Sequence, residues 1–325
     1  VDNNTLFVGG LFNTVNNIPR SDIAAVDLAT NSLTSLDINT GHAASVSSLA
    51  IDGDILYFAG SFTTVNGQVR DNIASVNIGA NNAMGALTDW AIDFNGTPRD
   101  MLIYNNKLIV GGPVHSTMGQ WLLGMSVFNL NPDGVPSLTD WYVRFNGGSV
   151  HTFDILGDII FVGGEFIFID GYRLSPLAAL DLINTTPGYY IYDWDPQIEG
   201  DPVTLRSADV FSVKIHNNVL YAGGFFKEMS GKPAGHLVAY NINLPLEKIV
   251  TETPPGDGTV QEPPPDENTG EDPPVENPEM PNDGGTQAPP NSSDNNSGGT
   301  GSINFPLLFV MACVFFLRRK NMTVK

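Results

Sequence analysis

The chain has 325 residues, of which 35 are Asp or Glu and 15 are Lys or Arg, so its formal net charge is −20. An acidic chain repels the phosphate backbone of nucleic acids, which excludes a nucleic-acid partner from the expected functions. The single cysteine, Cys313, lies in an apolar run near the C-terminus. Residues 1–250 therefore offer no thiol for a disulfide, a cysteine metal site or a cysteine nucleophile.

The charge divides the chain into three parts. Residues 1–250 carry 24 acids and 11 Lys or Arg, and residues 251–300 carry 11 acids and no Lys or Arg. Residues 301–325 carry four cations and no acid. We expect a folded repeat domain over 1–250, a linker over 251–300 and a separate C-terminal segment over 301–325.

One phrase recurs five times within residues 1–250. It stands as LFVGGLF at 6–12, LYFAGSF at 56–62, LIVGGPV at 108–114, IFVGGEF at 160–166 and LYAGGFF at 220–226. Each copy is followed by an apolar strand such as SDIAAVDL (21–28), and three units then carry an Asp-Trp piece. Four strands in a repeat of about 50 residues, with no helical period, predict the four-stranded antiparallel blades of an all-β propeller.

Turn residues support this prediction. Each unit after the first has a strand that ends in a tight turn, as in SLAIDGD (48–54) and MLIYNNK (101–107). Asn-Asn and Gly-Asp pairs tolerate the positive φ angles of two-residue hairpin turns, so turn chemistry explains them better than calcium ligation does. The Gly-Gly pair inside the recurring phrase predicts a close approach of a neighbouring segment.

These motifs resemble the delta-sixty-type repeats of the kelch-like β-propellers. The resemblance rests on the L-Y-V-G-G-x-F phrase, the following turn element, as in VNGQVR (65–70), and the Asp-Trp piece. It covers roughly residues 1–245 and implies a propeller of at least five blades. The first unit begins inside its opening strand, so we expect residues to be missing upstream. LEKIV (246–250) is the predicted fourth strand of the last blade.

The C-terminal parts carry a different signal. Residues 251–300 contain 11 prolines and 11 acids, a composition that predicts a disordered, extended linker. The apolar run from Ile303 to Leu317 is shorter than the roughly 20 residues of a stable membrane-spanning helix. A permanent single-pass anchor remains the alternative to a processed signal.

The order of small residues, apolar run and cations resembles the GlyGly-CTERM sorting signal of Gram-negative bacteria. Ser297, Gly298 and Gly299 match its small-residue motif, and Arg318, Arg319 and Lys320 match its basic cluster. The resemblance implies cleavage by a rhombosortase-type protease, type II secretion and only transient membrane residence through 303–317. The protein is then expected at the cell surface or outer membrane, or outside the cell.

The sequence predicts no catalytic, cofactor or metal site. The five histidines form no ligand-spaced pair, and we expect them to be satisfied or solvated. Recurring tryptophans could stack on sugars, but interblade packing is favoured, with the preceding Asp accepting a backbone or indole hydrogen bond. Recurring cations could bind acidic polysaccharide, but pairing with the repeated acids is favoured. The tryptophans are Trp90, Trp141 and Trp194, and the cations are Arg20, Arg70, Arg173 and Lys232.

The predicted function is therefore non-enzymatic. A rigid repeat domain that presents loops to the outside favours a binding or scaffold module with an extracellular glycan or protein as ligand. The alternative is the propeller part of an extracellular polysaccharide-active or other hydrolytic enzyme, with its catalytic residues in missing N-terminal sequence.

Overall fold

The computed structural model describes most of residues 2–248 and the short stretch 301–303. Inside 2–248 the description omits 42–43, 80–83, 93, 114–115, 119, 122–123, 132–133, 142, 147, 185–189, 201–206 and 244. The predicted linker, Ser297, Gly298, Gly299, the apolar run after Ile303 and the cluster Arg318, Arg319 and Lys320 lie outside the described residues. Among those that are described, no helix is long and apolar enough to cross a membrane.

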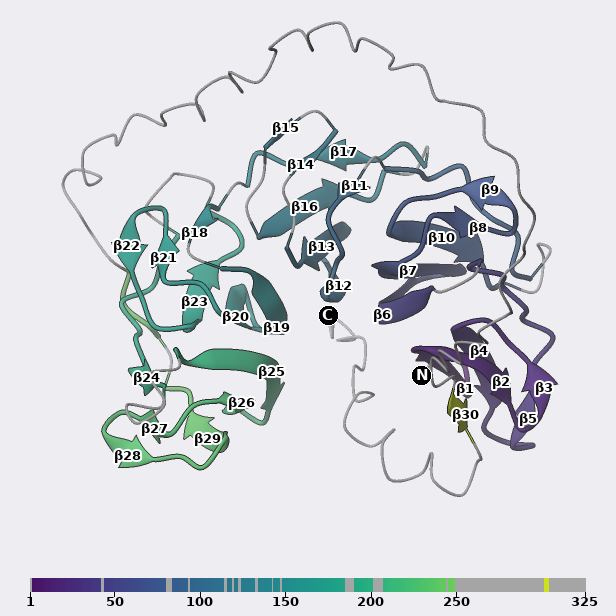
Figure 1. Ribbon diagram of the computed structural model, residues 1–325. Helices are drawn as coiled ribbons and strands as arrows, with labels where there is room; N and C mark the ends of the chain where they lie inside the picture. Colours follow the sequence, from purple (N-terminus) through teal and green to yellow (C-terminus); the bar gives the residue numbers. More distant parts are fainter. Residues whose placement is uncertain are drawn as a thin grey trace, which may run out of the picture. The chain divides into compact units, whose positions relative to one another are not determined.

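The described part is all-β, and its antiparallel sheets repeat as the blades of a β-propeller (Figure 1). Each blade from the second to the fifth begins with a long hairpin whose second strand pairs with a third strand. The strands are β6 (Ser45–Asp52), β7 (Ile55–Ser61) and β10 (Ile73–Asn77); β12 (Asp100–Tyr104), β13 (Lys107–Gly111) and β16 (Met125–Asn129); β19 (Val150–Leu156), β20 (Ile159–Gly164) and β23 (Leu177–Asp181); β25 (Asp209–His216), β26 (Val219–Phe225) and β29 (Leu237–Asn241).

The first blade contributes β1 (Thr5–Gly9), β4 (Ile23–Asp27) and β5 (Ser32–Leu33). The predicted fourth strand is present here as β5 and in the third blade as β17 (Ser137–Leu138). In the second and fourth blades it is reduced to single bridges, Val76 to Leu87 and Leu180 to Ile191.

The long hairpins close through the predicted two-residue turns. Asn105 and Asn106 have φ angles of 46° and 60°, and Asn217 and Asn218 have φ angles of 50° and 61°. Gly53 has a φ angle of 55°. These left-handed angles suit the twist of a β-hairpin, and Asn and Gly adopt them at low cost. Turn chemistry therefore accounts for these residues, as predicted.

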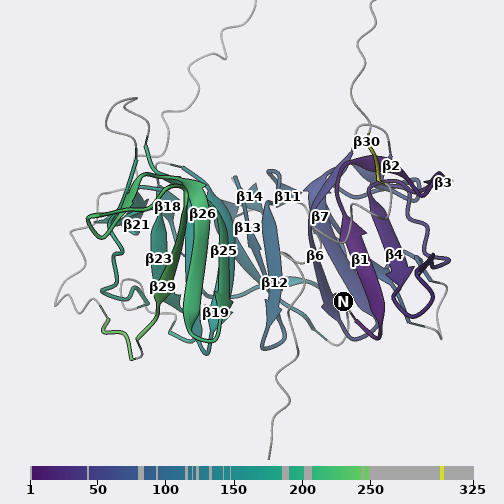
Figure 2. The same ribbon diagram turned by 90° about the horizontal axis from the view of Figure 1, so that it is seen from below.

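A second, shorter hairpin follows the second strand of each blade. These hairpins are β2–β3 (Phe12–Val15, Ile18–Pro19), β8–β9 (Thr64–Val65, Gln68–Val69), β14–β15 (Ser116–Thr117, Gln120–Trp121), β21–β22 (Phe168–Ile169, Tyr172–Arg173) and β27–β28 (Glu228–Met229, Lys232–Pro233). In three blades the hairpin pairs with a segment that precedes the first strand: β11 (Phe94–Asn95), β18 (Phe145–Asn146) or β24 (Ile198–Glu199). Figure 2 shows β14 and β21 at the same end of the long strands. The stretch Gly301–Ile303 forms β30, which pairs in parallel with β2.

Successive blades pack through their first strands and through the glycine pair. A Cβ at Gly111 would approach Phe153 of the next blade to 2.6 Å, and a Cβ at Gly163 would approach Val210 to 2.5 Å. A Cβ at the second glycine, Gly164, would overlap the carbonyl oxygen of Ser149 in its own blade. The predicted close approach is therefore confirmed, and it serves both interblade and intrablade packing.

One strand prediction is wrong. Within 245–248, Lys248 bridges to Tyr192 and the Glu247 carbonyl accepts a hydrogen bond from the Asp193 N–H at 2.7 Å, so this segment extends the fourth blade instead of closing the fifth. The Lys248 ammonium pairs with Asp181 and lies 5.6 Å from the centre of the Tyr192 ring. Burial opposes ionisation of Asp181, but the hydrogen bond from Lys248 and backbone N–H donors lower its pKa overall. A charge pair thus attaches the end of the repeat domain to the fourth blade.

The glycine packing leads to a first prediction. We expect Gly163→Ala to lower the free energy of unfolding by about 1–3 kcal/mol, because the new methyl group collides with Val210 across the blade junction. Urea denaturation of the full chain measures this change.

The matched control is Gly223→Ala. Gly223 holds the same position in the fifth blade, but no atom lies closer than 3.9 Å to its added Cβ. We expect a change within about 0.5 kcal/mol. Equal losses in the two variants would contradict interblade contact as the cause.

Candidate functional site

A row of polar side chains connects the first strands of successive blades. The hydroxyl of Ser48 in the second blade accepts the N–H of Met101 in the third at 3.0 Å. A carboxylate oxygen of Asp100 accepts the N–H of Phe153 in the fourth blade at 3.0 Å. Ser48, Asp100 and Thr152 occupy the same position in the first strands of their blades. At this position the side chain of each blade accepts a backbone N–H of the next blade.

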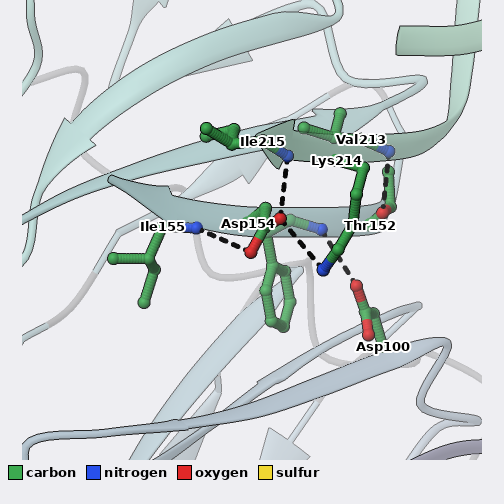
Figure 3. Close-up of polar contacts among 8 residues, drawn as sticks. Asp100, Thr152, Asp154, Ile155, Val213, Lys214 and Ile215 are labelled. Atoms are coloured by element: carbon green, nitrogen blue, oxygen red, sulfur yellow. Dashed lines mark hydrogen bonds and ion pairs between the residues drawn. The ribbon is translucent and has the colours of Figure 1, made fainter. Parts of the chain in front are cut away.

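The junction between the fourth and fifth blades carries the densest part of this row (Figure 3). Thr152 accepts the N–H of Val213 at 3.2 Å, and Asp154 accepts the N–H of Ile215 at 2.9 Å. The same oxygen of Asp154 lies 3.0 Å from the Lys214 ammonium. Because Asp154 is buried, its carboxylate needs these donors, and together they hold the two strands in one register.

The three recurring tryptophans are buried at blade junctions. Trp90 packs edge-on against Tyr57 of the second blade and Phe128 of the third, with ring centres 5.2 and 6.4 Å apart. Trp194 packs in the same manner against Phe161 and Tyr240 of the fourth and fifth blades.

Trp141 joins the core shared by the third and fourth blades, and its indole N–H donates to the Asp181 carbonyl at 2.9 Å. The exposed fractions of the three tryptophans are 4%, 7% and 8%, which leaves no ring face for a sugar. Interblade packing is confirmed. The acceptor of the Trp141 indole is a backbone carbonyl of the next blade and not the preceding Asp140.

The recurring cations do not occupy one structural position. Arg20 and Arg70 directly follow the short hairpins, and their guanidinium groups donate to the carbonyls of Thr34 at 3.0 Å and Thr88 at 3.2 Å. The expected pairing of these two arginines with acids is therefore wrong. The backbone N–H groups of Arg20 and Arg70 each donate to the carbonyl seven residues earlier in the chain. In the fourth and fifth blades Leu174 and Ala234 make this bond, so they are the equivalent residues. Arg173 and Lys232 instead lie inside β22 and β28.

His151 departs from the expectation for histidines. Its side chain is only 4% exposed, so it is not solvated, and although Nε2 contacts the Ser149 hydroxyl, Nδ1 makes no hydrogen bond. His216 and His236 are exposed, and His42 and His115 lie outside the described residues.

His151 lies close to two carboxylate side chains, and all three residues are of types that bind metal ions. The Nδ1 atom of His151 lies 3.0 Å from a carboxylate oxygen of Asp209, and its Nε2 atom lies 3.7 Å from a carboxylate oxygen of Glu165. One ligand atom from each of the three residues lies within 4.8 Å of the others. The hydroxyl of Ser149 contacts both His151 Nε2 and Glu165, each at 3.0 Å. Among the described residues, these three form the group whose imidazole nitrogen and carboxylate oxygens could hold a metal ion.

This group is not apparent in the sequence, because its members lie 14 and 44 residues apart along the chain. The sequence signal for this group is the place that each of its members holds within the repeat. His151 lies at a β-bulge, Glu165 directly follows the glycine pair, and Asp209 opens the next blade's first strand.

No protein-family model and no curated protein matches the sequence. The chain is similar to the computationally designed Ika4 protein, at 14% identity and a TM-score of 0.38, over 64% of this chain and 96% of that one. It is also similar to the RRP9 WD40 repeats, at 15% identity and a TM-score of 0.40, over 62% of this chain and 52% of that one. A third similarity is to the Cps50 (Swd1) β-propeller domain of Myceliophteria thermophila, at 11% identity and a TM-score of 0.35, over 70% and 81% of the two chains. The blade assignment depends on this chain's own strand pairing.

The burial of Trp141 generates a second prediction. We expect Trp141→Ala to lower the free energy of unfolding by about 3–5 kcal/mol, since it leaves a cavity between two blades. Trp141→Phe keeps most of the ring and should cost less. Chemical denaturation measures both variants, with glycan binding followed in parallel. Unchanged stability together with lost glycan binding would overturn the packing role.

The Asp154–Lys214 contact leads to a third prediction. We expect Asp154→Ala to cost about 1–3 kcal/mol, because it leaves the Ile215 N–H without its acceptor. In a double-mutant cycle with Lys214→Met the coupling should be at least about 0.5 kcal/mol. Lys232→Met, which alters another lysine of the fifth blade, is the control and should show no coupling. Equal coupling in the two cycles would argue against a specific ion pair.

Proposed function

We propose that this protein is an exported, cell-surface-displayed β-propeller that acts as a non-enzymatic binding or scaffold module. The observation that carries the proposal is the hydrogen-bonded row between first strands. It joins the second, third, fourth and fifth blades in succession, so the connecting loops of these blades are presented at defined positions. A ligand then meets a preformed surface and pays little ordering entropy.

The tail supports the proposed address. The absence of cysteine from residues 1–250 fits an exported protein, and the acidic linker suits a spacer between a folded domain and an envelope. The apolar run is short for permanent residence in a bilayer, and the cations that follow it would stay on the cytoplasmic side.

We therefore propose that a rhombosortase-type protease cuts near Gly298 and Gly299 and that the type II machinery secretes the product. We further propose that the repeats are kelch-like, with an extracellular glycan or protein as ligand. The recurring phrase and the turn element that follows it carry this assignment.

Mass spectrometry of the mature C-terminus tests the address. The full chain is expressed in a Gram-negative host with the protease and in a matched host without it. We expect the surface protein from the first host to lack Arg318–Lys325 and the second host to retain the uncut chain.

The matched variants separate the motif from the linker. Replacing Gly298 and Gly299 by Val should block processing, whereas the same change at the linker pair Gly284 and Gly285 should not. A surface protein that still ends in Lys325 would refute the sorting proposal.

A further inference from the structure

We infer that His151, Asp209 and Glu165 form a binding site for a first-row divalent transition ion of the Zn²⁺ class, at the junction of the fourth and fifth blades. This site is independent of the proposed binding and sorting functions.

The hydrogen bonds around His151 fix which ring nitrogen is free. An N–H on Nε2 donates to the Ser149 hydroxyl, and the Ser149 hydroxyl donates to Glu165, each at 3.0 Å. This arrangement assigns the ring proton to Nε2 and leaves a lone pair on Nδ1. A metal-binding histidine characteristically uses its second ring nitrogen in this way, because the outer hydrogen bond fixes the tautomer and the ring orientation.

Nδ1 then faces a second acceptor. A carboxylate oxygen of Asp209 lies 3.0 Å away, and both atoms are buried without a hydrogen-bond partner. Two acceptors at this distance repel each other unless a positive charge lies between them. Although 3.0 Å would suit a hydrogen bond, the two atoms are not aligned to form one along the line that joins them. A cation set to one side of that line satisfies both.

The distance matches metal coordination. Two ligand atoms that bind one ion at about 2.1 Å, with an angle near 90–110°, lie about 3.0–3.4 Å apart. Glu165 completes the group, with a carboxylate oxygen within 4.8 Å of a ligand atom of each of the other two residues. Its side chain is 47% exposed, so it can adjust to an ion that enters from solvent. An imidazole with two carboxylates suits Zn²⁺ or Mn²⁺, whereas Ca²⁺ prefers oxygen ligands alone.

The repeats serve as an internal comparison. At the bulge position the second blade has Ser47, whose hydroxyl donates to the Pro98 carbonyl of the next blade at 2.6 Å, and the fifth has Phe211. At the position after the glycine pair the other units have Leu11, Ser61, Pro113 and Phe225. The three ligand types coincide at this junction, where Phe211 also stacks on the His151 ring with centres 5.6 Å apart.

Isothermal titration of the full chain with Zn²⁺, after treatment with a chelator, tests the inference. We expect one ion to bind per chain. Asp209→Asn and Glu165→Gln keep the shape of the side chains and should each weaken binding on the order of a hundredfold. Ser149→Ala removes only the outer hydrogen bond and should weaken binding about tenfold.

Substitution of Co²⁺ gives a readout that adventitious binding does not reproduce. A visible absorption band should appear with the native chain and disappear in His151→Ala, whereas the exposed-histidine control His216→Ala should keep it. Circular dichroism verifies that each variant is folded.

Three results would overturn the site. The first is the absence of saturable one-to-one binding. The second is binding that the Asp209 and Glu165 variants leave unchanged. The third is an affinity for Ca²⁺ equal to that for Zn²⁺ and unchanged in His151→Ala.

Discussion

The structure depends on the contact between the first strands of neighbouring blades. A first strand has one edge in its own sheet, and at the blade junctions its other backbone groups need partners from elsewhere. Ser48, Asp100 and Thr152 meet this need, because each accepts an N–H from the following blade. Sheets that are only loosely tied by apolar packing could slide against one another, whereas directional hydrogen bonds define one register.

The same junctions explain the other recurring residues. The first glycine of three pairs leaves room for an apolar side chain of the next blade: Gly9 for Val46, Gly111 for Phe153 and Gly163 for Val210. The tryptophans fill the apolar interface between blades, from the segments in which the chain leaves one blade and enters the next. Repetition in this sequence therefore reports interblade packing, and the departures from repetition indicate specialised positions.

His151 is such a departure. The β-bulge turns its side chain out of the alternating pattern and toward the fifth blade, where it meets Asp209. The resulting group combines an unsatisfied imidazole nitrogen with two carboxylates, which is costly unless a cation or a proton compensates it.

The sequence by itself determined the all-β class, the five repeats, the two-residue turns and the need for small residues at the glycine pair. These follow from local rules, since a turn needs particular φ angles and a strand needs alternating apolar residues. It also favoured packing for Trp90, Trp141 and Trp194, because a residue repeated at one position is most easily explained by a repeated contact.

Only the tertiary structure decided which residues meet across the blades. It paired Lys248 with Asp181 in the fourth blade, although sequence order favoured the fifth. It separated Arg20 and Arg70 from Arg173 and Lys232, which the spacing had grouped together. It also brought His151, Glu165 and Asp209 within 4.8 Å of one another. Interblade contacts join residues some 50 positions apart along the chain, so no local pattern of strands and turns encodes them.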